Sequence, residues 1–254
     1  MAGSILVKNI GELCTPLGSS ARRGEAMRDI LVIRDAAVLV RDGLVEYAGA
    51  SAGLGGATAA EERACAEGIA VLDACGRAVV PGFVDSHTHF VFAGYRDDEF
   101  LWRAQGMPYM EIHARGGGIR RTMAATRAAS LEELVELGEK RLRTMLSLGV
   151  TTVEGKSGYG LETAAELRQL EAMRVLSGRT PVTIVPTFMG PHSTPPEYQG
   201  RPSDYIDHVI SDMLPAVRAQ GVARFADIFC EKGVFGIEDS RRYLAAAKEL
   251  GFGL

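Results

Sequence analysis

Apolar runs alternate with long amphipathic segments along residues 79–254, and this alternation constrains the fold more than any other feature of the chain. The apolar runs have the length and composition of buried strands, whereas the segments between them repeat leucine at helical spacings. In the segment LEELVELGEKRLRTMLSLG, leucines recur every three or four residues, and the preceding Ser130 has the spacing of a capping box with Glu133. Strands that alternate with helices in this way are typical of a parallel sheet covered by helices.

The number of strand-like runs predicts an incomplete barrel. Four runs are present, AVVPGFVDSH, GVTTVEGKS, PVTIVPTFMG and ARFADIFCE, and the terminal GFGL has the character of the beginning of a fifth. A closed (β/α)₈ barrel needs eight such units and usually about 250 residues. We therefore predict an α/β fold in which about four βα units form the first half of a TIM barrel. We also expect the chain to be the N-terminal part of a longer protein.

A different pattern occupies residues 1–78, where short apolar runs are separated by turn residues. Alternating runs such as SILVKNIGEL, together with the hairpin signal Asp42-Gly43, predict a small antiparallel β-structure. The segment GASAGLGGATAAEERACAEG is expected to be a loop with one helical turn. The predicted organisation is thus a β-rich segment at 1–78 followed by the half barrel at 79–254.

Composition and charge exclude several classes of partner. The 254 residues are 46% hydrophobic and carry a net charge of −4, which gives no electrostatic reason to expect nucleic acid or an anionic membrane. No apolar run approaches the roughly 20 residues of a membrane span, and the first residues lack a secretion signal. The four cysteines contain no C-x-x-C pair and are expected to be reduced thiols of a cytoplasmic protein. The expected partner is a small-molecule substrate.

His87 and His89 are the strongest candidates for a metal site. They are separated by one residue at the end of a strand-like run, so their side chains should leave the same face of the strand. Two neighbouring neutral imidazoles form half of a site for zinc or iron. Asp85 shares that face and could orient the pair. The alternative is two solvated histidines on an edge strand.

Other chemistry-bearing side chains also follow the strand-like runs, where parallel α/β barrels carry their reactive groups. Arg96 comes after the first run, Glu154, Lys156 and Tyr159 end the second, His192 follows the third, and Cys230 and Glu231 end the fourth. Arg96 could bind a carboxylate with both arms of its guanidinium group, or it could be an ordinary surface arginine. Lys156 could equally be an ion-pair partner of Glu154.

Three further features are interpreted as structural. His113 and His208 lie in segments whose pattern predicts a helix, and they are expected to be hydrogen-bonded surface or core residues. The glycines at 116–118 precede a helix and could bind an anion at its N-terminus, but a mobile loop is the simpler interpretation.

The run PGFVDSHTH resembles the first-strand signature of the amidohydrolase superfamily, and the longer sequence is similar to the imidazolonepropionases within it. The similarity continues in family order through HTHFVFAGYRDDEF, GGGIRRTMAATRAAS, GVTTVEGKSGYGL, TFMGPHSTPPEY and DIFCEKGVF. Two positions depart from the family pattern. Gly155 replaces an aliphatic residue and Pro191 replaces an alanine, and neither change removes a reacting group.

The resemblance implies a metal-dependent hydrolase with one divalent ion, zinc or iron, whose first two ligands are His87 and His89. It implies that Arg96, Tyr159 and His192 contact the substrate, with Arg96 facing a propionate carboxylate. The implied reaction is hydrolysis of the cyclic amide bond of 4-imidazolone-5-propanoate to N-formimidoyl-L-glutamate, a step of histidine degradation, by water that the metal activates. The β-rich start would pack with C-terminal strands into a composite β-sandwich side domain.

The resemblance also implies that part of the active site lies beyond Leu254. The family's third histidine ligand follows the fifth strand, and its aspartate, both ligand and general base, comes later still. We therefore expect no catalytic residue within residues 1–254. Two imidazoles are fewer than the three protein ligands of a catalytic zinc site, and a half barrel has an unpaired strand edge. This stretch alone is predicted to be inactive and prone to aggregate.

Two alternative functions stay open. Another amidohydrolase, such as a guanine- or cytosine-type deaminase or a cyclic amidase, would share the first strand. A binuclear cyclic amidase would need a carbamylated lysine after the fourth strand, where this sequence has Glu231, with Lys232 on the opposite face. The other alternative is a non-catalytic truncated relative that serves as an interaction or structural protein. The oligomeric state is open, and a homodimer is compatible with the sequence because many such barrels pair.

Overall fold

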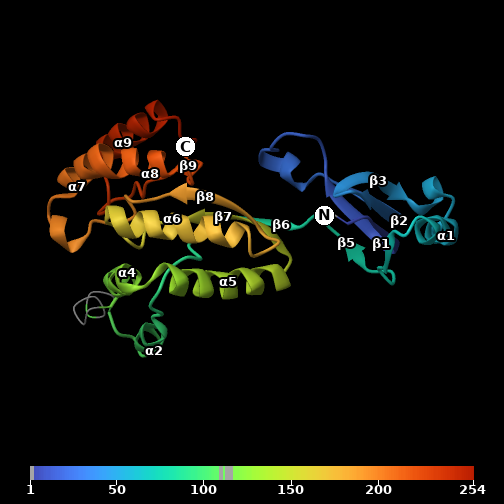
Figure 1. Ribbon diagram of the computed structural model, residues 1–254, viewed down its shortest axis with the longest axis horizontal. Helices are drawn as coiled ribbons and strands as arrows, with labels where there is room; N and C mark the ends of the chain where they lie inside the picture. Colours follow the sequence, from blue (N-terminus) through green and yellow to red (C-terminus); the bar gives the residue numbers. More distant parts are fainter. Residues whose placement is uncertain (1–2, 109–110, 112–116) are drawn as a thin grey trace. The chain divides into compact units, whose positions relative to one another are not determined.

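The computed structural model describes residues 3–108, 111 and 117–254 (Figure 1). The chain forms two compact units, Met1–Pro81 and Gly82–Leu254. Each unit has its own sheet and its own buried core. Within the described part of the chain, no helix has both the length and the apolar composition needed to cross a membrane.

The first unit contains a five-stranded mixed sheet with the order β3-β2-β1-β4 and with β5 also paired to β1. Antiparallel pairs join β1 to β2 and β2 to β3, whereas β4 and β5 run parallel to β1. The hairpin between β2 and β3 turns at Asp42 and Gly43, whose φ angles of 51° and 81° are those of a type I′ turn. The elements are β1 (Ile5–Pro16), a 3₁₀ turn (Gly24–Arg28), β2 (Ile30–Arg41), β3 (Leu44–Ala50), a 3₁₀ turn (Ser51–Leu54), α1 (Ala57–Ala66), β4 (Ala70–Asp73) and β5 (Ala78–Val79).

Two predictions for this unit are wrong. The sheet is not purely antiparallel, and the segment expected to be a loop with one helical turn contains the ten-residue helix α1. The two errors have one cause, because a strand that returns parallel to β1 needs a crossover connection, and the alanine-rich sequence ATAAEERACA forms that crossover as a helix. Ala60 and Ala64 of α1 pack on Leu6 of β1 and on Ile69, which directly precedes β4.

The second unit is built on a parallel sheet with the order β6-β7-β8-β9. Gly253 makes a parallel bridge to Phe225, so a fifth strand begins beside β9, as the sequence predicts. The elements are β6 (Phe83–Thr88), α2 (Asp97–Ala104), α4 (Ile119–Ala128), α5 (Leu131–Ser147), β7 (Val150–Lys156), α6 (Thr163–Ser177), β8 (Thr183–Phe188), a 3₁₀ turn (Pro196–Tyr198), α7 (Pro202–His208), a π turn (Val209–Met213), α8 (Leu214–Gln220), β9 (Phe225–Ala226) and α9 (Ile237–Glu249).

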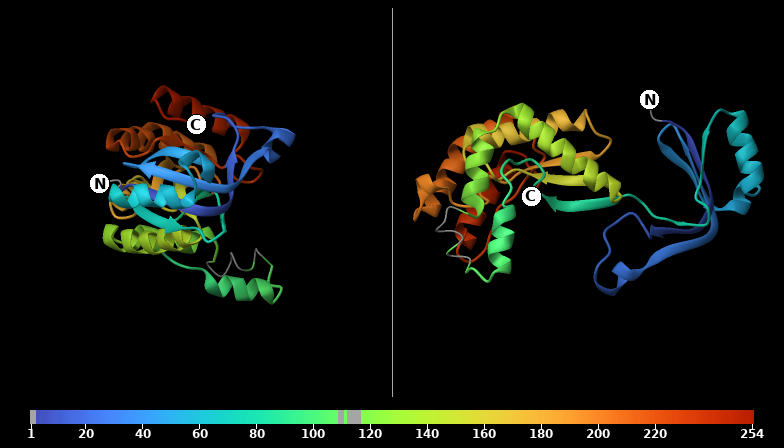
Figure 2. Two further views of the ribbon diagram at one scale, coloured as in Figure 1. Left: turned by 90° about the vertical axis from the view of Figure 1, so that its right-hand side faces the viewer. Right: turned by 90° about the horizontal axis from the view of Figure 1, so that it is seen from below.

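Helices cover one side of this sheet (Figure 2). Helix α5 packs beside α6, and both contact the strands. The core between them contains Leu134 and Leu142 of α5, Leu170 and Leu176 of α6, and Val153 of β7. The fold is therefore an incomplete (β/α)₈ barrel, which confirms the predicted fold class. The predicted capping box is also present, because the Ser130 hydroxyl accepts from the Glu133 N–H and the Glu133 carboxylate accepts from the Ser130 N–H.

The strand β9 is shorter than the sequence predicts. It ends at Ala226, so Cys230 and Glu231 lie in the following loop and are exposed. The residue directly after this strand is Asp227, and its backbone N–H donates to the Phe188 carbonyl at 2.9 Å. The prediction that Cys230 and Glu231 end the fourth barrel strand is wrong, because a continuous apolar run does not show where strand pairing stops.

Candidate metal centre

His87 and His89 lie side by side at the end of β6. Their ring centroids are 5.7 Å apart, with the rings edge to face. His87 is exposed, whereas both ring nitrogens of His89 are buried and have no hydrogen-bond partner among the described residues. An unsatisfied buried nitrogen is costly, so native structures nearly always provide it with a partner. A metal ion beside the two rings would provide a partner for one of the two His89 nitrogens, and the residues present therefore fit such an ion.

His192 and Tyr159 complete a cluster of rings around His89. The His192 ring stacks on His89 with centroids 4.5 Å apart, and the Tyr159 ring lies 5.1 Å from His89 and 5.3 Å from His192. The Nδ1 atom of His192 is 2.7 Å from the Gly158 carbonyl oxygen. Because that oxygen can only accept, Nδ1 carries the proton in the neutral ring and Nε2 keeps its lone pair. The sequence-predicted residues His87, His89, Tyr159 and His192 are thus brought together.

Burial keeps the imidazoles of His89 and His192 neutral. It lowers the pKa of His89 to about 3, with further lowering from His192 and His87, and burial also lowers the pKa of His192. The pKa of the Tyr159 phenol is raised by burial, although the positive charge of Arg96 opposes this shift. At neutral pH the rings of His89 and His192 are therefore neutral imidazoles, the form that binds metals, and Tyr159 is a protonated phenol.

Arg96 directly precedes α2, and its positive charge acts on the Tyr159 phenol of this cluster. Its Nη1 atom is 3.8 Å from the Glu99 carboxylate, and its side chain is 38% exposed, so the guanidinium group is accessible to a ligand.

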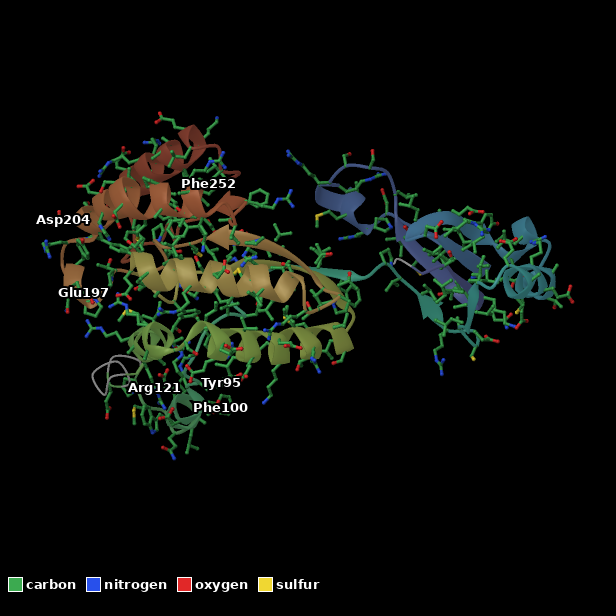
Figure 3. The ribbon with its side chains drawn as sticks, in the orientation of Figure 1. Tyr95, Phe100, Arg121, Glu197, Asp204 and Phe252 are labelled. Carbon is green, nitrogen blue, oxygen red and sulfur yellow. The ribbon has the colours of Figure 1, made fainter. Side chains whose placement is uncertain are left out.

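The N-terminus of α4, where the sequence suggests that an anion could bind, is occupied by the Glu99 carboxylate. This carboxylate accepts from the Gly118 N–H at 2.6 Å. Arg121, labelled in Figure 3, joins α4 to α2 through two hydrogen bonds of 2.6 Å to Asp98. Gly116 and His113 lie outside the described residues.

A buried lysine network lies beside the ring cluster on the inner face of the sheet. The Nζ atom of Lys156 donates to Glu154 at 2.6 Å and to Asp227 at 2.8 Å, and the Thr187 hydroxyl donates to Glu154 at 2.7 Å. These side chains line a hollow of about 400 Å³ between the strands. The ion pair between Lys156 and Glu154 is one of the alternatives that the sequence leaves open. Asp227 was not anticipated, because the fourth strand was expected to continue past it.

Asp85 contacts the backbone at the end of β6, and its expected role in orienting the two imidazoles stays a prediction. Its carboxylate accepts from the backbone N–H of His87 at 3.2 Å, so it holds the strand end. In the parts of the chain that the structure describes, no group of three or more histidine, cysteine, aspartate or glutamate side chains is placed to hold a metal ion. His87 and His89 would therefore need further ligands to hold an ion.

Three polar residues behind the cluster, Arg141, which is half-buried, and Glu166 and Gln169, which are buried, were missed from the sequence. Arg141 of α5 donates to the carbonyls of Phe90 and Phe92 at 2.8 Å each. Glu166 and Gln169 of α6 are completely buried. Their position in the sequence could have indicated that Glu166 and Gln169 are buried, because they fall on the same helical stripe as the core residues Met173 and Leu176. A polar residue on such a stripe needs a buried partner, but the sequence does not identify the partner.

Comparison with known proteins identifies the class to which this fold and this ring cluster belong. A model of the amidohydrolase family matches residues 78–233, and the chain belongs to this family. Amidohydrolases are metal-dependent hydrolases.

Several similar proteins of known name point to one branch of that family. The chain is 51% identical over 253 residues to the imidazolonepropionase of Symbiobacterium thermophilum, covering 98% of this chain and 58% of that protein. It is 47% identical over 253 residues to the imidazolonepropionase of Parabacteroides distasonis, covering 98% of this chain and 59% of that protein. These matches confirm the sequence resemblance. The chain spans less than two thirds of the length of these relatives.

Solved structures support the fold. The chain is similar to the guanine deaminase of E. coli with a TM-score of 0.58 and 14% identity, covering 98% of this chain and 59% of that one. It is similar to the 5-methylcytosine deaminase of Klebsiella pneumoniae with a TM-score of 0.52 and 16% identity, covering 97% of this chain and 55% of that one. At these identities the likeness shows the shared architecture alone.

Proposed function

We propose that residues 1–254 are part of an imidazolonepropionase that hydrolyses the cyclic amide bond of 4-imidazolone-5-propanoate to N-formimidoyl-L-glutamate in histidine degradation. One divalent ion, zinc or iron, would be held by His87, by His89 and by ligands outside these residues. The observation that carries the proposal is the buried His89 ring, which has no hydrogen-bond partner among the described residues and lies 5.7 Å from the second imidazole. The similarity to imidazolonepropionases supports the choice of substrate.

The side chains around the metal site have separate roles in this proposal. When bound, the metal would act as a Lewis acid and activate water for hydrolysis. His192 has its Nδ1 proton held by the Gly158 carbonyl, so its Nε2 atom is free to accept a hydrogen bond from the substrate. Tyr159 stays protonated and can donate its hydroxyl proton in a hydrogen bond. Arg96 offers its guanidinium group to the propionate carboxylate.

Arg96 provides the sharpest test of the substrate. In the full-length protein, Arg96→Met should raise KM for 4-imidazolone-5-propanoate by about 10- to 100-fold, since a charge-assisted hydrogen bond of about 1.5–3 kcal/mol is lost. The metal content should not change, because Arg96 is not a ligand in this proposal. Steady-state kinetics and elemental analysis of the same samples measure both quantities.

The matched control is Arg103→Met, which removes an exposed arginine from the last turn of α2, the helix that directly follows Arg96. This variant should have the kinetics of the wild type. Equal loss of metal and turnover in Arg96→Met would contradict the role of Arg96 in substrate binding. No turnover of this substrate by the metal-loaded wild-type protein would contradict the proposed reaction.

A cytoplasmic location is part of the proposal, because all four cysteines are free and unpaired thiols persist in a reducing compartment. A homodimer is the assembly that we would test first, by light scattering of the full-length protein.

The composite side domain, in which further strands join residues 1–78, is also a proposal. It is supported by the exposed apolar side chains Leu31, Val32, Leu44 and Val45 on this sheet.

A further inference from the structure

Four consecutive backbone N–H groups after β7 are all held by two side chains of α6. The Glu166 carboxylate accepts from Gly158 at 2.9 Å, and from Gly160 and Leu161 at 2.8 Å each. The amide oxygen of Gln169 accepts from the remaining one, the Tyr159 N–H, at 3.3 Å. The segment 158–161 therefore has a side-chain acceptor for each of its N–H groups.

This arrangement is costly to build, which argues that the segment's conformation is specifically maintained. Glu166 and Gln169 are both 0% exposed. A buried carboxylate loses its hydration, and burial raises the pKa of Glu166 while the backbone donors oppose the shift. The segment also contains two positive φ angles, 106° at Gly158 and 54° at Leu161, and the second is unfavourable for leucine. Hydrogen bonds from α6 stabilise this strained conformation.

The same two side chains connect this segment to the ring cluster. The Gly158 carbonyl, on the residue whose N–H binds Glu166, accepts from Nδ1 of His192 at 2.7 Å. The amide nitrogen of Gln169 donates to the carbonyl of Val91 at 2.7 Å, two residues after His89. Gln169 thus bridges the segment after β6 and the segment after β7.

We propose that Glu166 and Gln169 are positioning residues that fix the segment 158–161, and through it the Tyr159 ring and the tautomer of His192. For its effect on turnover, this role rests on the proposed function. Neither side chain is expected to touch the substrate, since both are completely buried beneath the segment. The distinction from a purely structural role is that loosening the segment should change the site without unfolding the protein.

The test uses Glu166→Gln in the full-length, metal-loaded protein. Glutamine has nearly the same shape, but its NH₂ group cannot accept, so one backbone N–H loses its acceptor. Amide hydrogen exchange in peptides covering 157–161 should become about tenfold faster or more. The value of kcat/KM should fall by about 10- to 100-fold, as expected for a misplaced binding group. The metal content should stay at the wild-type level, because His87 and His89 belong to β6 and its end.

Gln169→Met is the second variant, and it decides the question if Glu166→Gln does not fold. Methionine keeps the length of the side chain and removes both hydrogen bonds, so the same changes in exchange and in kcat/KM are expected. Glu171→Gln is the matched control, since Glu171 lies on the same helix and pairs with Arg174 near the surface. It should change neither quantity.

The proposal is overturned if a folded Glu166→Gln or Gln169→Met variant keeps wild-type exchange at 157–161 and wild-type kcat/KM, even if its Tm is lower. If the wild-type protein does not hydrolyse 4-imidazolone-5-propanoate, the proposed function fails. The exchange rates then decide by themselves whether Glu166 and Gln169 fix the segment.

Discussion

At the scale of single residues, the best-defined charged group of the second unit is Lys156, at the end of β7. Lys156 is 5% exposed and lies between two carboxylates. Burial lowers its pKa, but the hydrogen bonds and charges of Asp227 and Glu154 raise it by more, so the net shift is upward. The raised pKa means that the folded state favours the ammonium form, which makes Lys156 a structural cation of this face of the sheet.

Lys156→Met should therefore destabilise the protein. The change leaves Glu154 and Asp227 without their shared cation, and we expect a loss of about 2–3 kcal/mol in the free energy of unfolding at pH 7. This is below the usual cost of breaking a buried pair because Asp227 is 38% exposed and partly screened by water. Urea denaturation of the full-length protein measures the change, and the exposed Lys140→Met on α5 is the control.

The pH dependence of the wild type gives the sign of this interaction. Since the folded-state pKa of Lys156 is raised, its contribution is fully present below the unfolded pKa near 10.4 and is lost as the pH rises through the higher folded-state pKa. The stability difference between wild type and Lys156→Met should shrink in that alkaline range. An unchanged difference up to pH 11 to 12, roughly the end of the accessible range, would contradict the assignment.

At the scale of elements, the strands and long helices of the second unit were predictable because their signals are local. Period-two alternation placed His87 and His89 together, and the spacing of Ser130 and Glu133 identified the start of α5. The helix α1 was missed because its alanine-rich sequence has no clear apolar stripe. The role of Asp227 was missed because it depends on where β9 stops pairing. The roles of Glu166 and Gln169 were missed because they depend on the positive φ angles at Gly158 and Leu161. Sequence periodicity reports neither.

The capping box of α5 should contribute measurably to the free energy of unfolding. Ser130→Ala should lower the free energy of unfolding by about 1 kcal/mol, because the Glu133 N–H loses its acceptor and the reciprocal bond is weakened. Ser130→Asp keeps an N-cap acceptor and should be close to the wild type. Thermal denaturation of both variants distinguishes the cap from a general effect of substitution, and equal loss in both would contradict the capping role.

At the scale of the whole molecule, both units expose apolar surface that a stable soluble domain usually covers. The exposed fractions reach 66% for Val84 on β6, and 75% for Leu44 and 65% for Val45 on β3. The chain also spans only 58–59% of the imidazolonepropionases compared above. Unpaired strand edges and contiguous apolar surface favour association between chains.

Residues 1–254 expressed alone should consequently aggregate and show no hydrolysis of 4-imidazolone-5-propanoate above background. Size-exclusion chromatography with light scattering, together with an activity assay, tests both parts against the full-length protein. A monodisperse and active 1–254 protein would contradict the proposal that the site requires ligands and strands outside this range.

The central claim is that His87 and His89 hold one divalent metal ion, and the most direct test is elemental analysis of the full-length protein purified without chelator. We predict about one zinc or iron ion per chain in the wild type and in His208→Gln, a control on α7 away from the ring cluster, and a strong loss of metal in His87→Ala and His89→Ala. A wild-type protein without a stoichiometric transition metal would contradict the claim, and so would a His89→Ala protein with its full metal content.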